Sequence, residues 1–157
     1  MAVYQESNIG TGIERYPYCS KEEQRFRTEA DFYQYLSSVF FRQPDSFYAI
    51  WEDENEYKAA LRIEPYHNSS MLLCALETAP EARKKGYATL LIESVLSHLR
   101  NTNFGTVYSH VSKVNTPSLA VHLRTGFRII KNHAVYSDGS VLNSSYTLAF
   151  TINKSEI

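Results

Sequence analysis

The residues of this chain best suited to chemistry begin with a short basic turn, Arg83-Lys84-Lys85-Gly86. Three cations supply positive charge, and a glycine lets a phosphate approach the backbone because it has no Cβ. The turn precedes residues 88–99, whose apolar positions recur at helical spacing. A helix N-terminus also attracts anions through its unpaired N–H groups and its dipole. The pattern therefore predicts a diphosphate site, and a solvated turn before a surface helix is the alternative.

A second set of polar residues follows further along the chain. Asn115, Ser118 and His122 have the i, i+3 and i+7 spacing of one helix face. Leu119 and Leu123 would form the packed stripe of the same helix. The three polar groups are therefore expected to converge on one side, and a solvent-facing helix with an isolated histidine is the alternative.

Two familiar phosphate-binding patterns do not occur in the sequence. Neither the Walker pattern G-x-x-x-x-G-K-[ST] nor the dinucleotide pattern G-x-G-x-x-G is present. The basic turn instead resembles the acetyl-CoA loop of the GNAT superfamily of N-acetyltransferases, [Q/R]-x-x-G-x-[G/A], here Arg83-x-x-Gly86-x-Ala88. It lies between an apolar strand pattern and an amphipathic helix, as that family requires.

The stretch from Asn115 to Phe127 is similar to the second signature of the same family, N-x-x-[AS]-x-x-x-Y-x-x-x-G-F. Ser118 and Gly126 match it, and His122 stands where the family has tyrosine. Two independent patterns in the correct order and at the correct distance make coincidence improbable.

The resemblance covers about residues 48–150, and the first 45 residues match only as the family's variable helical pair. It implies an α/β fold of mixed type, and the length of the chain predicts one domain over residues 1–157. A central twisted mixed sheet of six to seven strands would be splayed between two parallel strands and flanked by about four helices. Acetyl-CoA, as the cosubstrate, would be wedged where those two strands part.

The resemblance also implies which residues hold the cosubstrate. Backbone groups at Leu76 and Thr78 would pair with the pantetheine arm, and Asn115 and Ser118 would flank that arm from the other side. The diphosphate would be held by the residues of the basic loop and helix start, namely Arg83, Lys84, Lys85, Gly86, Tyr87 and Ala88.

One departure from the family concerns the acid. The tyrosine that His122 replaces commonly protonates the leaving thiolate of CoA. An imidazole has an ordinary pKa of about 6.5 and is a weaker match to a thiol near 8.5, although it is still a workable proton donor. His122 is therefore predicted as the acid.

The other departure concerns the base. Family members place a glutamate early in the buried strand, where this chain has Met71 and Leu72, or five residues before the asparagine of the second signature, where it has His110. A histidine suits the removal of a proton from the acceptor ammonium near pH 7. His110 is therefore predicted as the base, and a structural histidine, Glu77, Glu64 or water are the alternatives.

The remaining patterns predict the elements around these residues. Two possible capping boxes, Ser20 with Glu23 and Thr28 with Asp31, predict two consecutive helices between residues 20 and 41. The other expected elements are a hairpin of Phe47–Trp51 and Tyr57–Ile63, a strand buried on both faces at Met71–Leu76, a strand at Phe104–Ser112, a helix from Asn115 that Gly126 closes, and a terminal hairpin of Phe127–Tyr136 and Val141–Phe150.

Composition limits the partners. Sixteen Lys and Arg against seventeen Asp and Glu give a formal net charge of −1, which favours neither nucleic acid nor an anionic membrane. No targeting segment or apolar span is evident, and Cys19 and Cys74 are a poor start for a disulfide framework, so the chain is expected to be cytoplasmic. No spacing of ligands suggests a metal. A homodimer is expected from the family and from the twelve Tyr and eight Phe.

The predicted function is direct transfer of the acetyl group of acetyl-CoA to a primary amine of an unidentified small molecule or protein. The first alternative is an acyl-CoA-binding module with the same fold and little or no turnover, which the histidine in place of tyrosine permits. The second is an unrelated α/β domain that binds anions.

Overall fold

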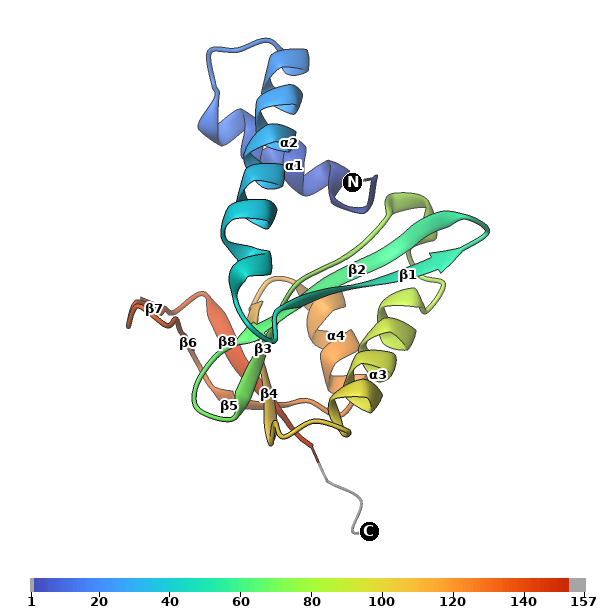
Figure 1. Cartoon of the computed structure of the whole chain (residues 1–157), viewed down its shortest axis with the longest axis vertical. Coiled ribbons are helices and arrows are strands. Elements are labelled where there is room, and N and C mark those ends of the chain that lie inside the picture. The colour runs from blue at the N-terminus through green and yellow to red at the C-terminus, as the bar shows by residue number, and fades with distance from the viewer. Residues whose placement is uncertain (1, 153–157) are drawn as a thin grey trace.

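The computed structural model describes residues 2–152, which form a six-stranded mixed sheet with helices on both faces (Figure 1). The strand order is β1-β2-β3-β4-β8-β5, and β3 and β4 are the parallel neighbours. The elements in chain order are η1 Ala2–Tyr4, α1 Gln5–Arg15, α2 Lys21–Ser38, η2 Phe40–Arg42, β1 Phe47–Asp53, β2 Glu56–Pro65, β3 Ser70–Thr78, η3 Pro80–Ala82, α3 Tyr87–Leu99, β4 Thr106–Ser112, α4 Thr116–Arg124, β5 Arg128–Lys131, β6 Ala134–Val135, β7 Val141–Leu142 and β8 Ser145–Thr151.

The core lies between the sheet and α3. Alternate residues of β2, such as Leu61 and Ile63, pack with Ile92 and Leu99 of α3, and all four are almost completely buried. The other residues of β2 alternate with these and point to the opposite face, where Ala60 contacts Tyr4 of η1. In Figure 1, α3 and α4 lie side by side below the sheet, while α1 and α2 rise above it as an arm. We call the side with α1 and α2 the arm face, and the side with α3 and α4 the core face.

The two parallel strands separate partway along their length. The β3–β4 ladder runs from the pair Ser70 and Thr106 to the pair Leu73 and Ser109 and then stops, although both strands continue. Just beyond this point the register of β3 with β2 shifts, and Ala75 has a φ of +52°. Such a bulge re-aims a strand and increases its twist. We call the open end of the two strands the fork. The expected splayed mixed sheet with about four helices is confirmed.

The prediction of two consecutive helices between residues 20 and 41 was wrong, because the single helix α2 covers most of this range. Ser20 does cap α2, since its side chain accepts a hydrogen bond from the backbone N–H of Glu23 at 3.2 Å. Thr28 starts no second helix, because its hydroxyl donates to the carbonyl of Gln24 at 2.8 Å inside the same helix. The sequence patterns did not predict α1, which packs closely on α2: a Cβ at Gly12 would lie 3.0 Å from Oγ1 of Thr28.

Two further expectations require correction. His122 of α4 is buried, with 1% of its surface exposed, whereas Leu123, which was expected in the packed stripe, is 48% exposed. The terminal hairpin is interrupted, because β5 pairs with β8 while β6 and β7 form a separate two-stranded sheet. Both corrections concern the segment that follows the fork.

No helix within residues 2–152 is long and apolar enough to cross a membrane.

Candidate active site

The fork brings together the two sequence signatures. The carboxyl end of β3 leads through η3 to the start of α3, and the carboxyl end of β4 leads to the start of α4. Both helices therefore begin at the open side of the two parallel strands. In α/β sheets, ligands bind at this kind of position, outside the carboxyl ends of diverging strands.

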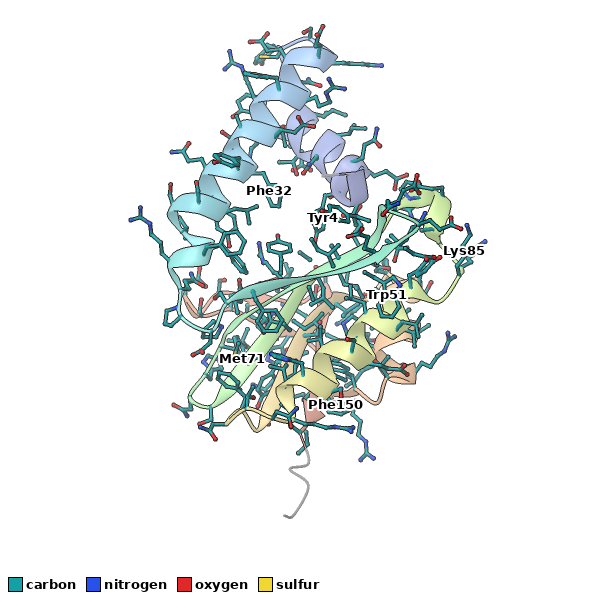
Figure 2. All side chains as sticks on the ribbon, turned by 45° about the vertical axis from the view of Figure 1, so that its right-hand side comes forward. Tyr4, Phe32, Trp51, Met71, Lys85 and Phe150 are labelled. Carbon is teal, nitrogen blue, oxygen red and sulfur yellow. The ribbon has the colours of Figure 1, made fainter. Side chains whose placement is uncertain are left out.

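The basic loop has the geometry of an anion site. Gly86 is the N-cap of α3, with a φ of +88°, and among the described residues no side chain caps this helix end. Lys84 also has a positive φ, +62°. Successive turns of this kind direct backbone N–H groups toward one point, which suits a phosphate. Lys84 and Lys85 are exposed, and the side chain of Lys85 points outward in Figure 2.

Arg83 and Tyr87 at the edges of the loop have partners within the protein. Arg83 makes an ion pair with Glu6 of α1 at 2.5 Å, and its Nε donates to the carbonyl of Thr78 at 3.3 Å. The hydroxyl of Tyr87 donates to Asp53 at 2.6 Å. These contacts hold the loop against the strands on either side. Of the predicted diphosphate residues, Lys84, Lys85, Gly86 and Ala88 make no side-chain hydrogen bond or ion pair within residues 2–152 and are available to a ligand.

The backbone of β3 beyond the ladder faces the fork. Leu76 and Thr78 are half-buried and lie past the last β3–β4 pair. Thr78 pairs with Ala59 of β2 on its other side, while Leu76 lies in the bulge. The edge of β3 toward β4 is therefore unpaired there, as a backbone that pairs with an extended ligand must be.

On the other side of the fork, Asn115 and Ser118 lie at the start of α4. The side-chain oxygen of Asn115 caps this helix by accepting the backbone N–H of Ser118 at 3.2 Å. Asn115 is exposed and Ser118 is half-buried. Both residues therefore border the opening from the side opposite Leu76 and Thr78.

His122 lies behind this opening on the core face, with both ring nitrogens engaged. Nδ1 is 2.8 Å from the backbone carbonyl of Ser118, which can only accept, so Nδ1 carries the proton. Nε2 is then the acceptor for the hydroxyl of Ser109, 3.0 Å away. Burial lowers the pKa of His122, opposed by the hydrogen bond to Ser118. The ring is therefore neutral near pH 7.

His110 follows Ser109 and points to the arm face. Its ring packs edge-on against Tyr66, with centroids 5.7 Å apart, and against Tyr136, at 5.0 Å. Both ring nitrogens are buried, and neither has a hydrogen-bond partner within the part of the chain that the structure describes. Burial lowers the pKa of His110, and the charges of His67 and Lys131 add to this effect.

The alternative bases are already bonded to neighbouring side chains. Glu77 accepts a hydrogen bond from the Ser7 hydroxyl at 2.7 Å, and Glu64 lies 3.4 Å from Nε of Arg62. Within the described residues, no group of three or more His, Cys, Asp or Glu side chains is placed to hold a metal ion.

Sequence reasoning missed Ser109, the partner of His122. The alternating burial of β4 places Val107, Ser109 and Val111 on the core face. A small polar residue between two valines on a buried face was the available signal, because a buried hydroxyl requires a partner.

Comparisons with known proteins agree with this geometry. A profile described as the Acetyltransferase (GNAT) family matches residues 12–127. Because the match spans more than half of the chain, the chain belongs to the GNAT family of acetyltransferases. Comparison with curated protein sequences gives no match.

Solved structures with the same fold include three acetyltransferases. Spermidine N-acetyltransferase from Vibrio cholerae, in complex with CoA and spermine, has a TM-score of 0.63 at 18% identity over 97% of this chain and 87% of its own. PaiA N-acetyltransferase from Thermoplasma acidophilum, in complex with coenzyme A, has a TM-score of 0.60 at 12% identity over 93% of this chain and 89% of its own. Ribosomal-protein-S18-alanine N-acetyltransferase from Escherichia coli has a TM-score of 0.58 at 16% identity over 72% of this chain and 73% of its own.

Proposed function

We propose that this protein transfers the acetyl group of acetyl-CoA directly to a primary amine. The observation that carries the proposal is the fork, which has an unpaired β3 backbone on one side and the uncapped N-terminus of α3 beside it. Acetyl-CoA has a diphosphate for the helix end and amide groups for the strand edge. CoA bound to two proteins of the same fold supports this assignment.

The two faces of the fork divide the reaction. His110 takes the proton from the amine on the arm face, since a neutral imidazole with free nitrogens is ready to accept one. The backbone N–H of Leu76 stabilises the negative charge that develops on the thioester oxygen. The new C–N bond forms as the C–S bond breaks, and the CoA thiolate leaves. No enzyme nucleophile is required.

The predicted acid, His122, has a less direct role in our proposal. Nε2 accepts from Ser109, so the neutral ring has no proton to give on that side. We propose that His122 positions α4 against β4, and that water protonates the thiolate. A thiol with a pKa near 8.5 is a fair leaving group near neutral pH without an acid.

Thermal unfolding with acetyl-CoA, CoA and ATP tests the cosubstrate site. At about a hundred times the dissociation constant a ligand adds about 2.7 kcal/mol, which raises the midpoint by several degrees. Gly86→Glu should abolish the rise for both CoA species. Gly139→Glu is the matched control, because Gly139 also has a positive φ and open space around its Cβ, but lies in the β6–β7 turn. No rise with either CoA species overturns the proposal.

One observation favours an acyl-CoA-binding module as the second candidate. Both nitrogens of His122 are engaged within the protein, at the position where the family commonly has its tyrosine. The two candidates differ in turnover. Release of free thiol from acetyl-CoA in the presence of any amine eliminates the module, whereas CoA binding without thiol release across an amine panel eliminates the enzyme.

We further propose that residues 1–157 act as one domain and form a homodimer. Ile9 and Ile13 of α1 are more than half exposed and line a cavity of about 610 Å³ between α1 and α2. This cavity contains none of the signature residues, so we place the reaction at the fork. Sedimentation of the wild type beside Ile9→Lys tests self-association: a monomer in the variant alone supports it, and a monomeric wild type overturns it.

A further inference from the structure

A row of polar side chains crosses the arm face at the level of the fork. Tyr48 of β1 is directly opposite Arg62 of β2, and Arg62 is directly opposite Cys74 of β3. Cys74 and His110 are the first residues beyond the last β3–β4 pair, one on each strand. The row therefore runs from Tyr48 to the proposed base.

Arg62 is held at its inner end only. Its Nε donates to Sγ of Cys74 at 3.1 Å and lies 3.4 Å from Glu64. Aromatic rings surround the guanidinium, with its central carbon 5.5 Å from the ring centre of Tyr35 and 5.9 Å from that of Phe40. Within residues 2–152, no ion pair and no hydrogen bond of good geometry engages its two terminal amino groups, and the nearby hydroxyl is that of Tyr48. About a quarter of the side chain is exposed.

Tyr48 adds a second free donor beside Arg62. Its hydroxyl is buried and has no hydrogen-bond partner of good geometry among the described residues. Burial raises the pKa of Tyr48, and the positive charge of Arg62 and a loose hydrogen bond from its guanidinium oppose that rise. In that contact the Tyr48 oxygen accepts, so its O–H remains available as a donor. Figure 2 shows Tyr4 and Phe32 on this side of the sheet. Their rings pack edge-on against the Tyr48 ring, with ring centroids 6.2 Å and 6.4 Å from its centroid. An unpaired buried hydroxyl is costly and calls for a ligand oxygen.

We infer that Arg62 and Tyr48 bind the carboxylate of the acceptor, so that the acceptor is an amine that also carries a carboxylate. A planar guanidinium pairs well with a carboxylate, and a tyrosine hydroxyl supplies a third hydrogen bond. Glu64 offsets part of the charge of Arg62, which suits a monoanion better than a phosphate dianion. The inference rests on the proposed function for the identity of its ligand.

The spacing of the row indicates the length of the acceptor. Arg62 and His110 lie on strands separated by β3, so their backbones are about 10 Å apart or more at the usual spacing of strands. An amine at His110 and a carboxylate at Arg62 must therefore be joined by several bonds. An ω-amino acid such as 6-aminohexanoate has this form.

The test compares 6-aminohexanoate with 6-aminohexanamide, which differ in the carboxylate alone. We expect kcat/KM to favour the acid at least tenfold, because hydrogen bonds to a charged group are strong. Arg62→Met should bring the ratio close to one, and Tyr48→Phe should lower it severalfold. Tyr57→Phe, at an exposed tyrosine of β2, is the control and should keep the ratio. Glu64→Gln should raise it.

The ratio separates recognition from folding, because a merely structural loss in Arg62→Met lowers both rates alike. Calorimetric titration of the two compounds into the protein, with and without CoA, reads the same site without turnover. Tighter binding of the acid that Tyr48→Phe weakens supports the inference even if no acetyl transfer occurs. Equal binding of acid and amide to the wild type overturns it, as does inorganic phosphate that displaces the acid at equal concentration. A loss of CoA affinity in Arg62→Met with an unchanged ratio also overturns it.

Discussion

His110 is half-buried and His122 is buried, on opposite faces of the fork, and burial lowers the pKa of both, yet their surroundings differ. The two ring nitrogens of His122 are hydrogen-bonded, Nδ1 to Ser118 within α4 and Nε2 to Ser109, and the bond to Ser109 joins α4 to β4. His110 leaves both nitrogens without a partner in the described chain, and its ring packs against the aromatic rings of Tyr66 and Tyr136. A buried polar group that is satisfied stabilises the fold, whereas one that is unsatisfied costs stability and is available to a ligand. This difference is the reason that we propose a structural role for His122 and a catalytic role for His110.

The largest expected effect separates the two histidines by rate. His110→Ala should lower kcat by about a hundredfold or more, because a positioned general base contributes at least that much. The free energy of unfolding of this variant should fall by only about 1 to 2 kcal/mol, because the ring contacts with Tyr66 and Tyr136 are lost but no hydrogen bond is. Thiol release and denaturant unfolding measure the two quantities. His98→Ala, at an exposed histidine of α3, is the control. An unchanged kcat in His110→Ala would remove it as the base.

The converse substitution should act on stability. His122→Ala removes a ring that is 1% exposed and leaves the Ser109 hydroxyl buried without its acceptor. The cavity and the lost hydrogen bonds should cost about 2 to 4 kcal/mol of unfolding free energy. Denaturant unfolding at pH 7.5 measures the loss. A variant that keeps its stability and its affinity for CoA but loses turnover would instead restore the predicted acid role of His122.

This contrast explains how much of the site the sequence could predict. The loop at Gly86 and the helix start at Asn115 follow from local spacing, the fork between two parallel strands follows from the resemblance to the GNAT family, and each is found where it was expected. The orientation of His122 does not follow from spacing. Helical periodicity alone allows either Leu123 or His122 to face the core. The orientation of the helix depends on the hydrogen bond between His122 and Ser109, which lies thirteen residues earlier on β4.

The fold shows the same limit. The capping pattern at Ser20 predicted the start of α2, but the equivalent pattern at Thr28 lies inside one continuous helix. Six consecutive apolar residues predicted β3 as buried on both faces. Met71 to Leu73 are buried, whereas Ala75 is exposed with a positive φ, because the strand turns away from β4 there. A bulge that depends on how the strand pairs with its neighbours cannot be predicted from a run of apolar residues.

The pH dependence of the rate tests the proposed role of His110 as the base. The base must be neutral to accept a proton, and burial with nearby positive charge lowers the pKa of His110 below its ordinary 6.5. In the free enzyme kcat/KM should therefore rise with pH through a midpoint below 6.5, before any rise from deprotonation of the acceptor amine. His67→Ala removes one of the neighbouring charges and should move that midpoint upward. A midpoint above 7 that is unchanged in His110→Gln would contradict the assignment.

The smallest expected effect is on the pH dependence of stability. The pKa of His122 is lowered in the folded protein, so the unfolded chain, with a pKa near 6.5, binds more protons at mildly acidic pH. The unfolding free energy should therefore be constant for this group above about pH 7 and should fall as the pH drops below 6.5 toward the folded pKa. His110 acts in the same direction, so His122→Gln should reduce this acid loss without removing it. Unfolding curves of the wild type and the variant at pH 7.5, 6.5 and 5.5 measure the difference. A wild type as stable at pH 5.5 as at 7.5 would mean that His122 is protonated in the fold, and a protonated Nε2 would then be a donor facing Ser109.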